Sequence, residues 1–423
     1  MLPDSRVLVV GTTPDYIDWI RRACPRRSLF VTDGKVRQRA KEANPGPSEE
    51  LLCDLTDHTK VLRTITAHTR QQGLSIDGVA CFDCESLALA ARLAETSGLP
   101  FPSPTAVANC RNKLLSKTIW LENGLCTPQV VPVRQVEDVV GFFMQIRTDC
   151  VLKPVSGSGS ELVFHCRTED ECRQAFAVLD NGLCRRADNR LYRDASPDSP
   201  LMLAEAFIDA TEFSCDFMLE NNRARLIRLC QKIPAVEGSP FGTTRGYLLV
   251  DTLPDIQRET LSRCLAQAAT TLGLSRSICM ADFMVRDGRV IILEITPRPG
   301  GDCLPALIRH AFGRDMLALT LDLAQNRPTA LDALPQQPGC LAGLRLHARQ
   351  AGVLKKINWE AIADDPRVRE VCPLRHPGDR ICLPPDDYET FLLGNIIFAP
   401  DSRETAVDEC RRILSALTVE MEA

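Results

Sequence analysis

Polar side chains of three kinds follow one another at every second position near residue 294. The stretch VIILEITPRPGGD at residues 290–302 begins as a β-branched strand and then spaces Glu294, Thr296 and Arg298 two residues apart. Because successive strand side chains point to opposite faces, these three project to one side. A carboxylate, a hydroxyl and a guanidinium on one face favour a site for a metal ion and a phosphate. The alternative is an edge hairpin that ends in a solvated polar turn.

A second carboxylate, Asp282, precedes an Asp-Gly turn signal at residues 287–288. A two-residue turn would pair Asp282 with Leu293 and put the two carboxylates on opposite faces. A three-residue loop over 287–289 pairs Asp282 with Glu294. We expect this second register, because two facing carboxylates supply the hard oxygen ligands of a magnesium site.

Two lysines and a loop of small residues could complete a phosphate site. Lys113 lies in the first turn of a helix predicted over 109–124, and Lys153 lies near the end of an apolar strand. The loop Val-Ser-Gly157-Ser-Gly159-Ser follows Lys153, and its backbone N–H groups can donate to phosphate oxygens. Lysine adds a point charge to the same oxygens. Taken singly, a solvated helix lysine and a flexible hairpin are the alternatives, and no Walker loop is present.

Composition limits the kind of protein that carries these groups. The chain has 423 residues, which predicts about three domains, and is 44% hydrophobic and 25% charged. A net charge of -5 and 5% aromatic residues argue against nucleic acid as the main partner. No apolar run is long enough for a membrane span, and residues 7–10 are too short for a signal-peptide core. We therefore expect a cytoplasmic protein without a membrane partner.

Nineteen cysteines are scattered along the chain, and most are expected to be buried free thiols in a reducing compartment. Cys81 and Cys84 form the one close couple, CFDC. A zinc or redox role for them is poorly supported, because no second pair or histidine follows at a useful spacing.

The elements that would position these residues predict an α/β plus α+β protein. A strand–helix–strand beginning, with strands near 6–11 and 29–33, indicates a parallel sheet, and only Gly11 stands where a dinucleotide site would carry three glycines. Residues 34–50 are polar and predicted to be a loop, and 180–200 an exposed excursion. Strands are expected at 161–165 and on both sides of a polar hinge near 208–212. The predicted domains are 1–104, 105–330 with a lid subdomain over roughly 117–200, and 336–423.

In this order, the motifs resemble the ATP-grasp superfamily. The order is a helix lysine, a strand lysine with a Gly/Ser loop, a Glu-bearing hinge and a carboxylate hairpin that ends E-x-T-x-R-x-G-G. Within that superfamily the chain looks most like the L-amino-acid ligases, which join a carboxylate to an amine. The resemblance implies an ATP-grasp fold with an N-terminal Rossmann-like pre-grasp domain and a small C-terminal α+β domain. It also implies ATP and Mg²⁺ as cofactors.

The resemblance also implies a role for each matching residue. Lys113 and Lys153 would hold the α- and β-phosphates, and Arg298 would steady the acyl phosphate and the tetrahedral intermediate. The remaining assignments are the lid glycines Gly157 and Gly159, the adenine hinge Glu205, Ala206 and Ile208, the ribose acid Glu212, the metal ligands Asp282, Glu294 and Thr296, a loosely matched phosphate contact Lys232, and Gly300 and Gly301, which would let the backbone approach the ligand.

Two positions depart from the family pattern. Thr296 stands where asparagine is usual, and Asp282 stands where glutamate is commoner. A hydroxyl is a shorter and weaker oxygen donor, so one metal ion would be held more loosely or through water. In the predicted loop over 234–246, Arg245 and Glu237 would contact a substrate amino acid or lie on a solvated surface.

The expected activity is ATP-dependent ligation of a carboxylate and an amine through an acyl phosphate, with amino acids or similar molecules as substrates. Relatives are commonly dimers, so a homodimer is possible. Two rival functions stay open. One is a non-catalytic ATP-binding regulatory protein, for which Thr296 is the one hint, and the other is a biotin-carboxylase-like enzyme. No Met-Lys biotinylation dipeptide is present in the sequence.

Overall fold

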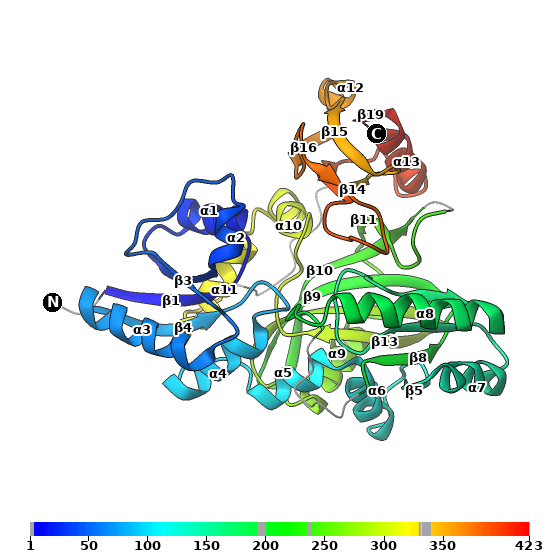
Figure 1. Cartoon of the computed structure of the whole chain (residues 1–423), viewed down its shortest axis with the longest axis horizontal. Coiled ribbons are helices and arrows are strands. Elements are labelled where there is room, and N and C mark those ends of the chain that lie inside the picture. Colours follow the sequence, from blue (N-terminus) through cyan, green and yellow to red (C-terminus); the bar gives the residue numbers. More distant parts are fainter. Residues whose placement is uncertain (1–3, 193–199, 236–237, 330, 332–339, 423) are drawn as a thin grey trace.

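The computed structural model describes residues 4–192, 200–235, 238–329, 331 and 340–422. Within these residues the strands form four sheets. Figure 1 shows the N-terminal unit at the left, the lid helices at the right and the C-terminal strands at the upper right. The chain between them forms most of the central sheet, which the C-terminal strands extend.

The N-terminal unit is a parallel sheet with the strand order β3-β2-β1-β4. The predicted strand–helix–strand beginning is therefore confirmed, and the loop predicted over residues 34–50 is wrong only at its two ends. Its first residues form a short helix whose start is capped by Asp33, which accepts a hydrogen bond from the Lys35 N–H at 2.8 Å. The elements are β1 (Asp4–Val10), β2 (Ser28–Asp33), β3 (Glu50–Cys53), β4 (Leu74–Ala80), α1 (Pro14–Ala23), α2 (Gly34–Gln38), α3 (His58–Gln72) and α4 (Leu87–Ser97).

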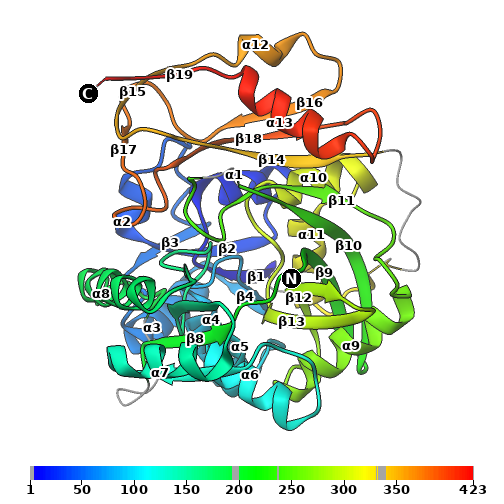
Figure 2. The same cartoon turned by 90° about the vertical axis from the view of Figure 1, so that its right-hand side faces the viewer.

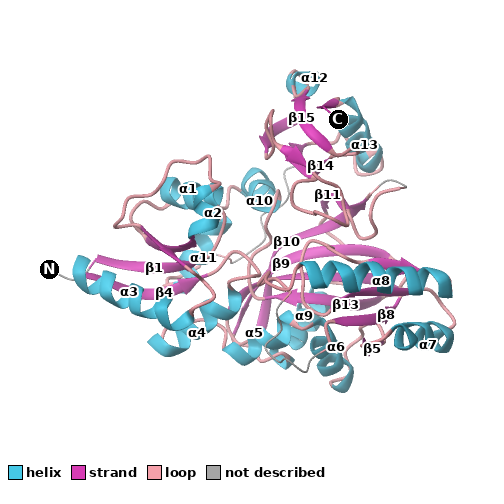
Figure 3. Ribbon diagram, in the orientation of Figure 1, coloured by secondary structure: helices cyan, strands magenta, loops and turns pink. Residues whose placement is uncertain are grey.

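Two helices follow the carboxylate hairpin in sequence, α10 (Leu304–Phe312) and α11 (Met316–Ala324). Helix α10 packs against the central sheet, whereas α11 packs against the N-terminal sheet. Leu317 and Leu321 of α11 pack with Val7 and Val9 of β1, whereas α3 and α4 cover the other face (Figure 3). The strands are thus buried on both faces, which explains their continuous apolar sequence.

The single helix predicted over 109–124 is two helices, α5 (Pro104–Arg111) and α6 (Lys113–Glu122). Asn112 between them has φ -92° and ψ 101°, and its side chain accepts a hydrogen bond from the Leu115 N–H at 2.9 Å. Asparagine favours this capping geometry because its side chain competes for backbone donors. The break makes Lys113 the first residue of α6 and turns it toward the lid.

The lid is an antiparallel sheet with the order β5-β8-β6-β7 and two helices. The predicted exposed excursion over 180–200 is wrong in part, because α8 continues to Arg185 and both Leu191 and Tyr192 are buried. Residues 193–199 of that excursion lie outside the described residues. The predicted strand over 161–165 is shorter and begins at Phe164. The elements are β5 (Val130–Val133), α7 (Val136–Ile146), β6 (Cys150–Pro154), β7 (Phe164–Cys166), α8 (Glu169–Arg185) and β8 (Met202–Ala206).

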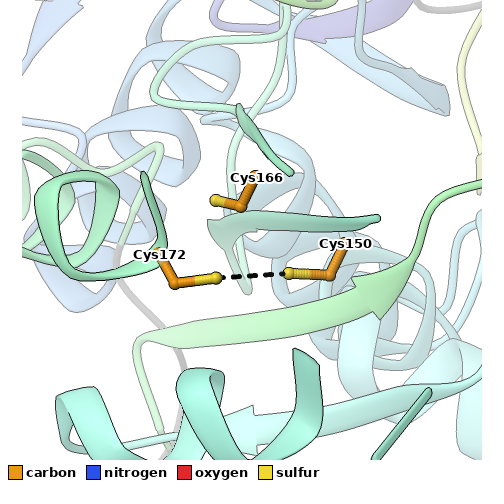
Figure 4. Close-up of side chains that lie close together, drawn as sticks. All are labelled: Cys150, Cys166 and Cys172. Atoms are coloured by element: carbon orange, nitrogen blue, oxygen red, sulfur yellow. Dashed lines mark hydrogen bonds between the residues drawn. The ribbon is translucent and has the colours of Figure 1, made fainter. Parts of the chain in front are cut away.

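Three thiols meet inside the lid. Cys150, Cys166 and Cys172 come from β6, β7 and α8, and their sulfur atoms lie within 4.8 Å of one another (Figure 4). All three are fully buried in the apolar core of the lid. Among the described residues no fourth histidine, cysteine or carboxylate joins them. They pack as small apolar side chains, as expected for buried free cysteine.

The central sheet has eight antiparallel strands in the order β13-β12-β9-β10-β11-β14-β18-β16. Helix α9 (Arg258–Thr271) covers one face of its first strands, together with α5 and α6. Its strands are β9 (Thr211–Glu220), β10 (Arg223–Pro234), β11 (Thr244–Leu249), β12 (Ser277–Arg286), β13 (Arg289–Thr296), β14 (Ala342–His347), β16 (Val368–Pro373) and β18 (Leu392–Phe398).

The C-terminal strands β14, β18 and β16 extend this sheet and do not form a separate one, as Figure 2 shows near the top. A three-stranded sheet and two helices cover them: β15 (Gly352–Ile357), β17 (Arg380–Ile381), β19 (Val419–Glu422), α12 (Glu360–Ala363) and α13 (Ala406–Ala416). The predicted domain limits stay a prediction. In the described part of the chain, none of the helices has both the length and the apolar character needed to cross a bilayer.

Candidate functional site

A cleft lies between the lid sheet and the central sheet. It encloses about 1330 Å³ of empty space, including its open mouth. Its walls bring together all the residues to which the sequence assigned a catalytic, nucleotide or metal role: Lys113, Lys153, Gly157, Gly159, Glu205, Ala206, Ile208, Glu212, Lys232, Asp282, Glu294, Thr296 and Arg298.

The two predicted metal carboxylates face each other. Asp282 of β12 pairs directly with Glu294 of β13, as expected, but the predicted three-residue loop is wrong. The turn has two residues, Asp287 and Gly288, both with positive φ of 52° and 67°. A bulge at Leu293 shifts the register by one residue and brings the carboxylates together.

Lys232 links the first of these carboxylates to the predicted ribose acid. Its Nζ lies 2.8 Å from Asp282 Oδ2 and 2.5 Å from Glu212 Oε1. Burial alone would lower the pKa of Lys232, but Asp282 and Glu212 outweigh it and raise that pKa above its usual range. The other oxygen of Asp282, Oδ1, is buried and has no hydrogen-bond partner.

Lys113 reaches both the second carboxylate and the lid loop. Its Nζ lies 3.3 Å from Glu294 Oε2 and donates to the carbonyl oxygen of Gly157 at 3.1 Å. Burial would raise the pKa of Glu294, but Lys113, Lys153 and Arg111 lower it to about 2. Glu294 is therefore ionised across the physiological range, as a metal ligand must be.

A buried carboxylate sits between two more lysines. Glu205 forms ion pairs with Lys153 and, at 3.3 Å, with Lys117, whose Nζ also donates to the Leu293 carbonyl at 2.6 Å. Burial lowers the pKa of Lys117 to about 8, although Glu205 opposes the shift. The two lysines in turn hold the pKa of Glu205 below its usual value in spite of its burial.

Lys117 was missed by sequence reasoning, which also gave Glu205 only a hinge role. The signal was present: Lys117 lies four residues after Lys113 on the same helix, so the two side chains share a face. A pair of lysines on one helix face is common on a solvated surface, and their burial could not be read from the spacing.

Arg298 lies in the loop after β13 and lines the cleft. Its Nη1 donates to the Pro299 carbonyl at 2.8 Å, and its Nε lies 3.1 Å from Cys84 Sγ on the N-terminal unit. Burial opposes its charge, but the neighbouring Cys84 thiol raises the pKa of Arg298 above its usual value. The guanidinium is therefore a permanent cation held at the junction of two units.

The loop that carries Arg298 is anchored by a buried ion pair that the sequence did not reveal. Asp216 and Arg228, both fully buried, lie 2.6 Å apart on β9 and β10. Arg228 also donates to the Ser214 carbonyl and hydroxyl, each at 3.0 Å. Asp216 Oδ1 accepts a hydrogen bond from the Gly300 N–H at 2.8 Å.

Glycine at position 300 is required by this anchor. A Cβ there would lie 2.7 Å from Leu304 Cδ1 and 2.9 Å from Arg228 Nη2. A Cβ on Gly301 would make ordinary contacts, 3.7 Å from the Tyr16 hydroxyl. Close packing against the buried pair therefore accounts for Gly300, which we had expected to let the backbone approach the ligand.

An aromatic group borders the hinge end of the cleft. The rings of His165 and Phe207 stack with centroids 4.2 Å apart, and Phe241 lies 5.0 Å from His165. Phe207 and Phe241 line the cleft next to Ala206 and Ile208. This apolar, aromatic wall suits a flat heterocycle, and sequence reasoning had not singled it out.

The donor set at the opposite end of the cleft suits a magnesium ion. Asp282 and Glu294 offer hard carboxylate oxygens, and the unpartnered Asp282 Oδ1 is free to take a cation. Thr296 Oγ1 lies 3.3 Å from Glu294 Oε1, so its hydroxyl borders the same position.

Arg245 and Glu237 were predicted to lie in a loop and either to contact a substrate amino acid or to lie on a solvated surface. Arg245 belongs to strand β11 and not to the predicted loop over 234–246. Glu237 lies outside the described residues.

One segment of the chain matches a known family of domains. Residues 146–306 match the family model of the ATP-grasp domain. The chain thus contains an ATP-grasp domain, and this domain includes lid residues and central-sheet residues that line the cleft.

Among the proteins to which this chain is similar are one known sequence and two solved structures. The chain is 28% identical over 261 residues to a D-alanine–D-alanine ligase of Acidovorax ebreus (strain TPSY), covering 59% of this chain and 73% of the relative. The crystal structure of an L-amino acid ligase from Bacillus licheniformis superposes with a TM-score of 0.76 at 19% identity, covering 99% of both chains. The biotin carboxylase domain of the Hydrogenobacter thermophilus 2-oxoglutarate carboxylase, solved with MgADP and bicarbonate, gives a TM-score of 0.68 at 15% identity, covering 99% of this chain and 91% of that one.

Proposed function

We propose that this protein is an ATP-dependent carboxylate–amine ligase. It joins amino acids or similar molecules by an amide bond and releases ADP and phosphate. The observation that carries the proposal is the convergence of Lys113, Lys153 and the facing pair Asp282 and Glu294 in one cleft. The relatives named as amino-acid ligases support it.

The cleft offers a separate place for each part of the nucleotide. The aromatic wall beside Ala206 and Ile208 takes adenine, and Glu212 takes the ribose hydroxyls. Lys113 is paired with Glu294 and Lys153 with Glu205, the residue before Ala206, and both lysines neutralise the phosphates. Bound Mg²⁺, held by Asp282, Glu294 and Thr296, supplies further charge neutralisation at the phosphates.

A carboxylate must be activated before an amine can replace one of its oxygens, because oxide is a poor leaving group. A carboxylate oxygen attacks the γ-phosphorus of ATP, the bond to ADP breaks, and an acyl phosphate forms. The amine then attacks the acyl carbon, and phosphate leaves with one oxygen of the original carboxylate. Arg298 stabilises the negative charge that develops on the acyl oxygen.

The lid limits side reactions. Lys113 donates a hydrogen bond to the Gly157 carbonyl of the Gly157–Gly159 loop. A phosphate bound by Lys113 would compete for this lysine and so change the position of the loop. Closure over the phosphates excludes water, which would otherwise hydrolyse the acyl phosphate.

The test is a screen of amino-acid pairs for ATP-dependent phosphate release, with detection of the amide product by mass. The proposal predicts release that requires both substrates and a product mass equal to their sum minus water. Lys153→Met serves as the inactive control, because it removes a phosphate contact.

The structural likeness to a biotin carboxylase domain favours a second candidate, a carboxylase. Bicarbonate-dependent ADP formation without an amino acid would support it against the ligase. Tight ATP binding without turnover in any pair would instead indicate the non-catalytic regulatory protein.

A further inference from the structure

We infer that the cleft continues into an anion site formed by Arg245, Arg345 and His347, which holds a free carboxylate of the amine substrate. This inference rests on the proposed ligase function and names the class of its acceptor: an amine that carries its own carboxylate, such as an amino acid.

The three side chains share one face of the central sheet. Strands β11 and β14 pair with Gly246 opposite Leu344 and Tyr247 opposite Gly343, a register that continues to Arg245 opposite Arg345. Side chains two residues apart in a strand point the same way, so Arg245 lies beside Tyr247. Tyr247 and Arg345 both line the cleft.

The charges at this end of the cleft do not balance. Arg345 is paired with Asp302, whose Oδ2 lies 2.5 Å from its Nε, and Asn395 donates to the other oxygen of Asp302 at 2.8 Å. Arg245 is only 8% exposed, yet no hydrogen bond or ion pair of its side chain occurs among the described residues. Among the described residues Arg345 therefore has a carboxylate partner and Arg245 has none.

His347 is also short of a partner. Its ring stacks on Phe391 with centroids 4.4 Å apart, and its Nε2 is buried without a hydrogen bond. Burial and the neighbouring Arg345 and Arg245 lower the pKa of His347 to about 3, so the ring is neutral at pH 7. Burial, Arg349 and Arg411 likewise lower the pKa of Arg245. A neutral ring can donate one hydrogen bond to an anion beside the guanidinium groups.

A buried cation without a partner destabilises a fold, so its retention points to a ligand that supplies the missing charge. A planar guanidinium matches a carboxylate through two parallel hydrogen bonds. The site is linked to the reaction centre through Asp302, which follows the loop of Arg298 and pairs with Arg345. Strands β9 and β10 separate β11 and β14 from the strands β12 and β13 that carry the carboxylate pair, so we assign the site to a carboxylate other than the one that is activated.

The experiment compares each active acceptor amino acid with its primary amide, which lacks the anion. Wild type, Arg245→Gln and the exposed control Arg349→Gln are assayed for amide product. We expect Arg245→Gln to raise KM for the acid about 10-fold or more, since a hydrogen bond to a charged group contributes roughly 1.5–3 kcal/mol. The same variant should leave KM for the amide unchanged, and Arg349→Gln should resemble wild type with both.

Stability gives an independent measurement. Arg245→Gln removes a buried, unpaired charge, so its Tm should equal or exceed that of wild type, whereas loss of a structural arginine would lower it. Calorimetric titration of the acid and its amide into both proteins, with MgADP present, tests binding without turnover. Equal binding of acid and amide by wild type, or equal weakening of both by Arg245→Gln, overturns the anion site. Absence of product with every pair overturns the ligase proposal instead.

Discussion

Substitution of Asp216 by asparagine removes one charge from the buried pair that anchors the Arg298 loop. The change keeps the size of the side chain, so a cavity is not created. It leaves Arg228, which is fully buried, without its counter-ion. It also weakens the acceptor for the Gly300 N–H.

The magnitude follows from these contacts. Breaking a buried ion pair by removing one partner destabilises a protein by about 3–5 kcal/mol, because the remaining charge is uncompensated. Arg228 keeps its hydrogen bonds to Ser214, so we expect the lower half of that range, about 3 kcal/mol. The double variant Asp216→Asn/Arg228→Gln should recover part of the loss, since no buried charge is left.

Urea denaturation followed by circular dichroism measures the free energy of unfolding of each variant. The matched control is Asp408→Asn, which removes a carboxylate 3.1 Å from Arg411 in an exposed pair and should change stability by less than about 1 kcal/mol.

A loss below about 1 kcal/mol in Asp216→Asn, or a double variant no more stable than the single one, would refute this account of the pair. The catalytic consequence is separate: kcat should fall more than nucleotide affinity, because the displaced loop carries Arg298.

Three further changes test neighbouring groups. Burial lowers the pKa of Lys117 from the usual lysine value of about 10.4 to about 8, so the unfolded chain binds more protons between these two pH values. The stability of wild type relative to Lys117→Met should therefore rise by about 3 kcal/mol across that window, and a flat difference contradicts the shift. Gly300→Ala should destabilise by about 1–3 kcal/mol in denaturant titration, because its Cβ meets Arg228, and an unchanged midpoint would be inconsistent with the packing. Thr296→Asn should lower the Mg²⁺ concentration needed for half-maximal rate, and an increase would show that Thr296 is not a ligand.

The parts of the fold with strong periodicity could be predicted from the sequence. The N-terminal strands were found because a strand buried on both faces is a continuous apolar run. The hairpin near residue 294 was found because its polar side chains recur at every second residue. The convergence of the lysines and carboxylates was predicted from their order along the chain, through the resemblance to ATP-grasp proteins.

Features that depend on the backbone conformation of a single residue could not be predicted. The Leu293 bulge and the Asn112 break both rest on a single residue, yet each changes the direction of a site side chain. The pairing of Asp282 with Glu294 was right for the wrong reason, because a bulge compensates for the shorter turn.

Buried charges were the other omission. Asp216 and Arg228 stand in apolar strands, where a charged residue usually marks an exposed edge. Their pairing depends on the alignment of two neighbouring strands and on the loop at Gly300. Charge in a buried strand is therefore a signal worth following, although the sequence alone does not identify its partner.

The acyl phosphate is tested most directly with a carboxylate substrate labelled with ¹⁸O in both oxygens. The amine, ATP, Mg²⁺ and the wild-type protein are incubated with it, and the released phosphate is analysed by mass. If a carboxylate oxygen attacks the γ-phosphorus, the phosphate carries one ¹⁸O for each amide formed. Phosphate without label, released alongside the amide, would contradict the account, because the carboxylate would then never have been phosphorylated.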